Sequence, residues 1–137
     1  PVERTGLSAY RHNTRQAPTL STNNIDMFVG DIFDLKQTQL GKIDAVYDRA
    51  ALVALPEKMR PLYSAHILSI TQQAPQLLIT FEYNQALMQG PPFSISELEV
   101  TQHFAGAFNT QCVDKLGVVG GLKGQVSAME CAWLLQR

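Results

Sequence analysis

The distribution of apolar positions predicts a chain built from short strands and two main helices. Apolar runs predict strands at three places in the first part of the chain: 25–30, 42–48 and 76–83. Two further strands are predicted at 108–119 and 125–135, and the glycine-rich segment GGLKG between them favours a terminal hairpin. Residues 34–42 are expected to form a short helix or turn.

Two stretches carry the signals of helices. Residues 56–73 have apolar side chains at helical spacing, which predicts one buried stripe made of Met59, Leu62, Tyr63, His66, Ile67 and Ile70. Pro56 suits the first turn, and Pro61 is expected to mark the start of the regular helix. Residues 94–106 predict a second helix, with two alternative capping boxes: Ser94 with Glu97, and Ser96 with Glu99.

The order of these elements predicts an α/β fold. Near-continuous apolar strands that alternate with helices indicate a mostly parallel sheet covered on both faces, with the last strand as an antiparallel edge. The length of 137 residues favours a single domain, residues 1–137. Residues 1–24 are polar and are predicted to be irregular, with a hairpin around Leu7–Arg11 and Leu20 as the alternative.

Composition excludes several classes of function. The chain has 12 acidic and 11 basic residues and no basic stripe with interleaved aromatic residues, so nucleic acid is not an expected partner. No apolar run approaches the ~20 residues that cross a membrane, and the N-terminus has no apolar signal core. We therefore expect a cytoplasmic protein without a membrane partner. Cys112 and Cys131 are expected to be reduced, buried thiols, with a disulfide as the alternative, and no metal site is expected.

Polar residues follow each of the first three predicted strands. Asp31 follows the first, Asp48 and Arg49 follow the second, and the third ends in Glu82, Tyr83 and Asn84. Ligands bind beyond the carboxyl ends of strands in open α/β sheets. If the three strands are adjacent and parallel, these side chains converge on one rim. The pair Asp48–Arg49 favours a site because apolar residues resume directly after it; the alternative is a buried ion pair that fixes the loop.

Four segments resemble one family of methyltransferases. They are GDIFDL, YDRAALVALPEKMRPLY, LLITFEYNQALMQGPPFSISELEV and the terminal WLLQR. These segments are similar to thiopurine S-methyltransferase, especially its bacterial form, and DRAALVALP and GPPF are specific to that family. The resemblance implies a Rossmann-like class I methyltransferase domain. It also implies S-adenosylmethionine-dependent transfer of a methyl group to a thiol, or to a chalcogen acceptor that contains selenium or tellurium.

The resemblance implies cofactor contacts at four positions. Asp31 and Ile32 match the place beside the adenine of the cofactor, where an acid can accept a hydrogen bond from the amine and Ile32 or Phe33 can cover the ring. Arg49 matches an arginine near cofactor and acceptor, and a guanidinium can hold an anionic group in fixed geometry. Asp48 is expected to orient Arg49.

The resemblance places acceptor recognition in the segment after the third strand. Tyr83 and Asn84 are expected to contact the acceptor, and Pro91, Pro92 and Phe93 to form a rigid apolar wall over it. Met88 is expected either to touch a ligand or to anchor this segment. Methyl transfer to an acidic thiol needs mainly positioning and exclusion of water, which agrees with the lack of a catalytic triad motif.

The resemblance also implies a missing part. Family members have a glycine-rich turn for the methionine part of the cofactor and an acid for the ribose, and neither is found here; residues 117–124 are predicted to be a plain turn because no helix follows. We therefore expect an N-terminally truncated domain, whose uncovered strand edge favours a homodimer. The alternative function is a catalytically inactive module that self-associates or binds a partner.

Overall fold

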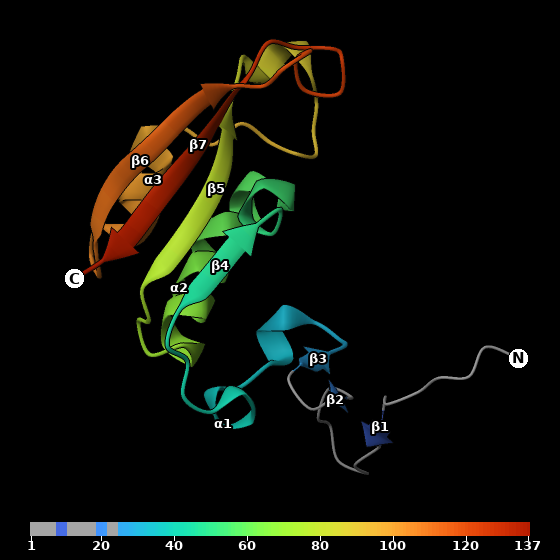
Figure 1. Ribbon diagram of the computed structural model, residues 1–137, viewed down its shortest axis with the longest axis vertical. Helices are drawn as coiled ribbons and strands as arrows, with labels where there is room; N and C mark the ends of the chain where they lie inside the picture. Colours follow the sequence, from blue (N-terminus) through green and yellow to red (C-terminus); the bar gives the residue numbers. More distant parts are fainter. Residues whose placement is uncertain (1–7, 11–18, 22–24) are drawn as a thin grey trace, which may run out of the picture. The chain divides into compact units, whose positions relative to one another are not determined.

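The chain separates into two compact units, residues 1–41 and 42–137, each with its own sheet (Figure 1). The structure is a computed structural model that describes residues 8–10, 19–21 and 25–137. The single domain expected over the whole chain stays a prediction.

The first unit contains a small antiparallel sheet. Its strands are β1 (Ser8–Tyr10), β2 (Thr19–Ser21) and β3 (Asp26–Phe28), in the order β1-β2-β3. The β1–β2 pairing confirms the hairpin alternative within the first 24 residues. A 3-10 helix, η1 (Ile32–Asp34), and the short helix α1 (Gln37–Leu40) follow β3, as the sequence predicts.

The second unit is a mixed four-stranded sheet. Its strands are β4 (Val46–Arg49), β5 (Gln76–Glu82), β6 (Asn109–Gly117) and β7 (Met129–Gln136), in the order β4-β5-β7-β6. β4 and β5 are parallel, with Asp48 opposite Leu78. β7 is antiparallel to both β5 and β6, so the predicted terminal hairpin is confirmed.

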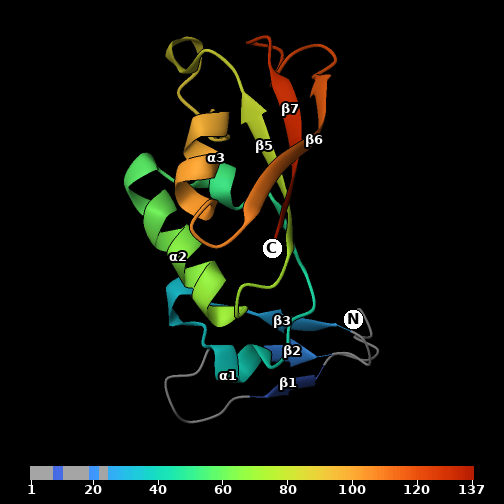
Figure 2. The ribbon, with the colours of Figure 1, turned by 90° about the vertical axis from the view of Figure 1, so that its left-hand side faces the viewer.

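Both long helices of the second unit cover the same face of its sheet (Figure 2). They are α2 (Arg60–Ile70) and α3 (Glu97–Phe104), and shorter 3-10 helices occupy the connections: η2 (Leu52–Ala54), η3 (Glu57–Met59) and η4 (Gln85–Leu87). The strands alternate in burial because successive side chains point to opposite faces. Leu78, Trp133 and Leu135 are buried on the strands. The predicted α/β, Rossmann-like fold is confirmed.

Two details of the predicted sheet are wrong. β3 pairs with β2 in the small antiparallel sheet, so the first three predicted strands are not parallel neighbours in one sheet. The four-stranded sheet has one parallel and two antiparallel pairings, and its antiparallel edge is β6 rather than the last strand. β7 takes the inner place because alternate side chains, including Cys131 and Trp133, are buried, whereas β6 is largely exposed.

The predicted stripe on α2 is shifted. Tyr63, Ile67 and Ile70 are buried, but Met59 and Leu62 are 37% and 63% exposed. The buried face instead includes Arg60 and Ser64, two polar residues that an apolar pattern does not find. The regular helix begins beside Pro61, and Ser96 caps α3 by accepting a hydrogen bond from the Glu99 amide, so the second capping alternative is confirmed at that bond.

The two cysteines differ in burial. Cys112 and Cys131 are both free thiols, but Cys112 is exposed and only Cys131 is buried, so the prediction of two buried thiols is half wrong. Burial raises the pKa of the Cys131 thiol. Among the described residues, no helix is both long and apolar enough to cross a membrane.

Candidate active site

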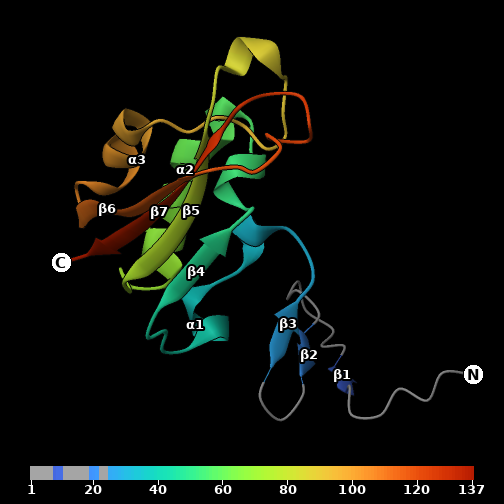
Figure 3. The ribbon, with the colours of Figure 1, turned by 45° about the horizontal axis from the view of Figure 1, so that its top comes forward.

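Two parallel strands end at the same edge of the four-stranded sheet. The arrows of β4 and β5 point the same way (Figures 1 and 3), with Arg49 paired to Ile79. Their carboxyl ends lead into two connections that we call the β4 loop (residues 50–56) and the β5 loop (residues 83–95). These two loops and the strand ends form the rim. Ligands bind at such edges in open α/β sheets.

Asp48 fixes the start of the β4 loop. Its side chain is 5% exposed, and one carboxylate oxygen accepts hydrogen bonds from the backbone N–H groups of Ala51 (3.2 Å) and Leu52 (3.4 Å). The other oxygen accepts a 2.8 Å hydrogen bond from the Tyr63 hydroxyl of α2. A buried carboxylate is tolerated when hydrogen bonds replace its hydration. Asp48 therefore joins strand, loop and helix.

The bond to Asp48 also affects Tyr63. Burial of the phenol, reinforced by the negative charge and the hydrogen bond of Asp48, raises the pKa of Tyr63 far above its ordinary value of 10.0. Tyr63 stays a neutral hydrogen-bond donor across the physiological pH range.

Arg49 lies next to Asp48 but points to the opposite side of the strand. Its side chain is exposed, and within the described part of the chain it has no hydrogen-bond or ion-pair partner. The alternative of a buried ion pair between Asp48 and Arg49 is therefore wrong, because alternation along β4 directs the two side chains to different faces. The role of Asp48 in orienting Arg49 stays a prediction, and such a role would act through the backbone, at a turn where Ala50 has a φ of 77°.

The β5 loop is held by side chains at its start and end. Tyr83 donates a 2.7 Å hydrogen bond from its hydroxyl to the Pro92 carbonyl, and its backbone N–H donates to the Ser94 hydroxyl at 2.9 Å. The Gln85 carboxamide accepts from the Ser94 N–H and donates to the Met88 carbonyl. Asn84 caps η4 by accepting from the Ala86 N–H at 3.1 Å. These contacts give Tyr83 and Asn84 structural roles in the loop.

Contacts from other elements hold the tip and base of the β5 loop. The Phe93 N–H donates a 2.6 Å hydrogen bond to the Val53 carbonyl, which joins the β5 loop to the β4 loop. The Lys123 ammonium donates a 2.6 Å hydrogen bond to the Pro91 carbonyl. Met88 is 8% exposed and belongs to a core cluster with three other buried residues, Leu122, Val126 and Ala128. Met88 therefore anchors the β5 loop, which was one of the two roles predicted for it.

The glycine-rich connection 117–124 supplies part of this support. Gly121 has a φ of +75°, and a Cβ there would lie 2.7 Å from the Val126 carbonyl oxygen. The segment leads into β7 rather than into a helix, so the prediction of a turn is confirmed.

Glu82, at the end of β5, pairs with Lys115 of β6 at 2.7 Å, and this hydrogen bond raises the pKa of Lys115.

The adenine-side candidates lie in the first unit. Asp31 is exposed and caps η1, because its carboxylate accepts a 2.9 Å hydrogen bond from the Phe33 N–H. Ile32 and Phe33 are half-buried. An exposed carboxylate followed by two apolar side chains fits the edge and face of an adenine. The prediction that Asp31, Ile32 and Phe33 share one ligand site with Arg49 stays a prediction.

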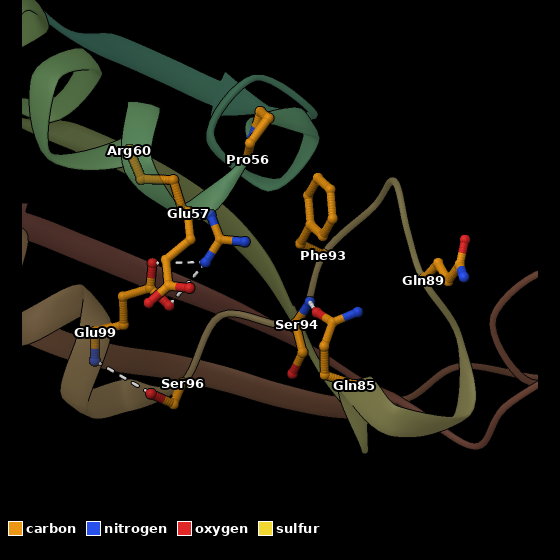
Figure 4. Close-up of a pocket in the computed structure, with 9 residues that line it drawn as sticks. All are labelled: Pro56, Glu57, Arg60, Gln85, Gln89, Phe93, Ser94, Ser96 and Glu99. Atoms are coloured by element: carbon orange, nitrogen blue, oxygen red, sulfur yellow. Dashed lines mark hydrogen bonds and ion pairs between the residues drawn. The ribbon is translucent and has the colours of Figure 1, made fainter.

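A pocket opens on the helix-covered side of the rim (Figure 4). Its volume is about 540 Å³, and the residues that line it are Pro56, Glu57, Arg60, Gln85, Gln89, Phe93, Ser94, Ser96 and Glu99. Phe93 is the one predicted site residue in this lining. The sequence patterns did not find Arg60 and Glu99, which form an ion pair, because burial of an arginine is not visible in an apolar pattern.

The described residues fit part of the expected cofactor. The first unit has an exposed carboxylate at the cap of η1, Asp31, and the second unit has an exposed cation, Arg49, but the described residues include no glycine-rich turn that leads into a helix. No group of three or more His, Cys, Asp or Glu side chains that could hold a metal ion was found where the structure describes the chain.

Comparison with known proteins identifies relatives over most of the chain. A family model described as thiopurine S-methyltransferase matches residues 3–134. Thiopurine S-methyltransferase from Teredinibacter turnerae is 50% identical over 117 residues, which cover 85% of this chain and 55% of the relative. The enzyme of that name from Xanthobacter autotrophicus is 49% identical over 117 residues, with the same coverage. That from Psychrobacter cryohalolentis is 38% identical over 118 residues, 86% of this chain and 54% of the relative.

These comparisons confirm the resemblance found in the sequence. The chain spans about half the length of the curated relatives that it matches.

Proposed function

Because the chain belongs to the thiopurine S-methyltransferase family, we propose that it takes part in S-adenosylmethionine-dependent methyl transfer to the sulfur of a thiol, or to a chalcogen acceptor. Family membership supports S-methyltransferase activity in general. The cofactor, the acceptor and the activity of this chain are our proposal.

The observation that carries the proposal is the exposed guanidinium of Arg49 at the rim, which has no hydrogen-bond or ion-pair partner among the described residues. Asp48 fixes the turn beneath it, and the hydrogen bond from Phe93 to Val53 holds the β5 loop against the β4 loop. A cation at a fixed strand end can bind the carboxylate of a cofactor or an anionic acceptor before its thiolate attacks the methyl group and the sulfonium leaves as a neutral thioether. Such an arrangement positions reactants rather than activating a nucleophile.

Each unit supplies residues to this proposal: Asp31, Ile32 and Phe33 in the first unit, and the rim in the second. S-adenosylmethionine supplies an electrophilic methyl group on a positively charged sulfur. Asp31 accepts a hydrogen bond from the adenine amine, and Ile32 and Phe33 cover the ring. Arg49 binds an anionic group of cofactor or acceptor. Pro91, Pro92 and Phe93 exclude water from the acceptor, whose own thiol is the nucleophile and loses its proton to solvent.

Titration and a methyl-transfer assay test the proposal together. We would titrate the chain with S-adenosylmethionine by calorimetry, and then measure transfer of radiolabelled methyl to 6-mercaptopurine. We expect saturable binding and turnover by the wild-type chain. Arg49→Ala is expected to lower kcat/KM by roughly 10- to 100-fold, because it removes one charge-assisted contact.

The matched control is Arg137→Ala, which removes another exposed arginine, whose side chain donates a 2.7 Å hydrogen bond to the Gln73 carboxamide oxygen. Its kcat/KM is expected to equal that of the wild type. No binding at millimolar cofactor would contradict the proposal for this chain, and equal activity of Arg49→Ala would contradict the role of Arg49.

The proposal includes a homodimer in the cytoplasm. β4 forms one end of the four-stranded sheet and carries Tyr47, which is 63% exposed. An unpaired strand edge with apolar neighbours favours self-association. Free thiols at Cys112 and Cys131 agree with a reducing compartment. Light scattering during gel filtration at micromolar concentration is expected to give twice the chain mass; a monomer would contradict the dimer.

A further inference from the structure

Arg60 is a buried cation that contacts three segments around the rim. The residue is only 5% exposed, although arginine is among the residues that are rarely buried. Its Nε donates a 2.9 Å hydrogen bond to the Leu55 carbonyl, which lies in the β4 loop. Its Nη1 donates to both carboxylate oxygens of Glu99 on α3, at 2.8 and 3.0 Å.

The third contact of Arg60 is with Phe93, one of the three residues predicted to form an apolar wall over the acceptor. The guanidinium carbon lies 5.2 Å from the centre of the Phe93 ring, within the range of a cation–π interaction. Figure 4 shows the Arg60 head between Glu99 and Phe93. Phe93 is also the residue whose N–H bonds the β4 loop at Val53. The face and the backbone of Phe93 are therefore both held.

The ion pair itself is fixed from the far side. The Glu99 backbone N–H donates a 3.2 Å hydrogen bond to the Ser96 hydroxyl, and the Glu99 carboxylate contacts Arg60 and His103. The His103 Nε2 lies 3.2 Å from Glu99 Oε1. Helix α3 thereby holds the Glu99 carboxylate in one position. The planar guanidinium of Arg60 binds that carboxylate and also contacts Leu55 in the β4 loop and Phe93 in the β5 loop.

We propose that Arg60 is a positioning residue for the acceptor: it holds Phe93, and with it the Pro91–Pro92–Phe93 wall, at the distance from β4 at which an acceptor is enclosed. This inference rests on the proposed function. Arg60 was not among the predicted site residues, and the inference gives it a role in the affinity for the acceptor. Arg60 acts through Phe93, so its loss raises KM for the acceptor and changes kcat and cofactor affinity little.

The alternative is a purely structural ion pair, and a double variant separates the two. Arg60→Met leaves the partly buried Glu99 carboxylate without its guanidinium and with His103 as its remaining partner among the described residues, which destabilises the fold for a general reason. The double variant Arg60→Met with Glu99→Leu removes both charges and is expected to recover stability. It does not recover the contacts of Arg60 with Leu55 and Phe93.

The test measures loop order separately from activity. Amide hydrogen exchange followed by NMR reports the Phe93 N–H and the Ile95 N–H, which bond Val53 and Phe81. In the double variant we expect the Phe93 amide to exchange about tenfold faster relative to amides of β5 and β7. Acceptor KM is expected to rise by about tenfold as well. Arg60→Lys keeps the positive charge but not the planar guanidinium. Its Phe93 amide exchange rate and its acceptor KM are expected to lie between those of the wild type and the double variant.

The matched control is Lys58→Met, which removes an exposed cation of the adjacent η3. It is expected to match the wild type in exchange and in KM. Wild-type exchange at Phe93 in the double variant would overturn the proposal, as would faster exchange that is uniform over the whole sheet. If the wild-type chain transfers no methyl group, the proposed function fails, and the exchange at Phe93 still decides whether Arg60 positions the wall.

Discussion

The two loops of the rim are fixed in different ways. The start of the β4 loop depends on one buried carboxylate, Asp48, whose partners are two backbone N–H groups three and four residues away in the sequence and one hydroxyl from α2. The β5 loop depends on many contacts spread over the fold. Its distant partners are Val53, Arg60 and Lys123.

The difference teaches where each loop is vulnerable. Loss of the Asp48 carboxylate removes three hydrogen bonds at the start of the β4 loop together, while the hydrogen bonds to the Val53 and Leu55 carbonyls remain. The β5 loop shares its support among several groups, and each change there is expected to loosen the loop while the sheet remains folded. Local opening of this kind is common in ligand-binding loops.

The largest expected effect follows from Asp48→Ala. The substitution leaves the buried hydroxyl of Tyr63 and the Leu52 N–H without their acceptor, and we expect the free energy of unfolding to fall by roughly 3 kcal/mol. Urea unfolding followed by the fluorescence of Trp133 measures this change. The neighbouring Arg49→Ala should stay within about 0.5 kcal/mol of wild type, because that side chain is exposed and has no partner among the described residues. Similar losses in both variants would contradict the contrast.

Gly90→Ala tests the β5 loop at its most crowded point. Gly90 has a φ of +86°, and a Cβ there would lie 2.7 Å from the Phe93 ring. We expect a loss of about 2 kcal/mol, together with faster amide exchange in the loop. Gly106→Ala is the control, because no atom lies within 4 Å of its added Cβ. Equal stability of the two alanine variants would contradict this expectation, because it would mean that the Phe93 ring moves aside without a loss of folding free energy.

Alkaline pH probes the link between the β4 loop and α2. The folded protein keeps the Tyr63 proton, whereas the unfolded chain loses it near pH 10. Stability is therefore present below pH 10 and is lost as the pH rises above it, by about 1.4 kcal/mol per pH unit from this residue. Urea unfolding between pH 9 and 11 should show this slope in wild type and a shallower one in Tyr63→Phe. The exposed Tyr47→Phe is expected to keep the wild-type slope.

Lys123→Met is expected to have the smallest effect. It removes an exposed hydrogen bond to the Pro91 carbonyl, so global stability should change by less than about 0.5 kcal/mol. Proteolysis or amide exchange should nevertheless show a more open segment around Pro91. Lys42→Met, which breaks an exposed ion pair with Asp44, is the control and should leave the loop unchanged. A large loss of global stability would mean that the β5 loop also depends on one group.

Local patterns were sufficient for most elements of the fold. Strands β4 and β5, helices α2 and α3 and the terminal hairpin follow from apolar runs, helical spacing and capping residues. The importance of Asp48 was also visible, since an acid that interrupts an apolar run needs partners. The alternative of an ion pair with Arg49 was wrong, because two adjacent residues on a strand point to opposite faces.

Pairing and shared support required the tertiary structure. Nothing local distinguishes a strand that joins the main sheet from one that, like β3, pairs with β2. Arg60 and Glu99 are 39 residues apart, and neither has a sequence signal for the other. The sequence by itself determined the elements, the family and the residues at the strand ends, because these depend on neighbours along the chain. The folded chain alone decided which of these residues meet, because burial and hydrogen bonding act between segments that are distant in sequence.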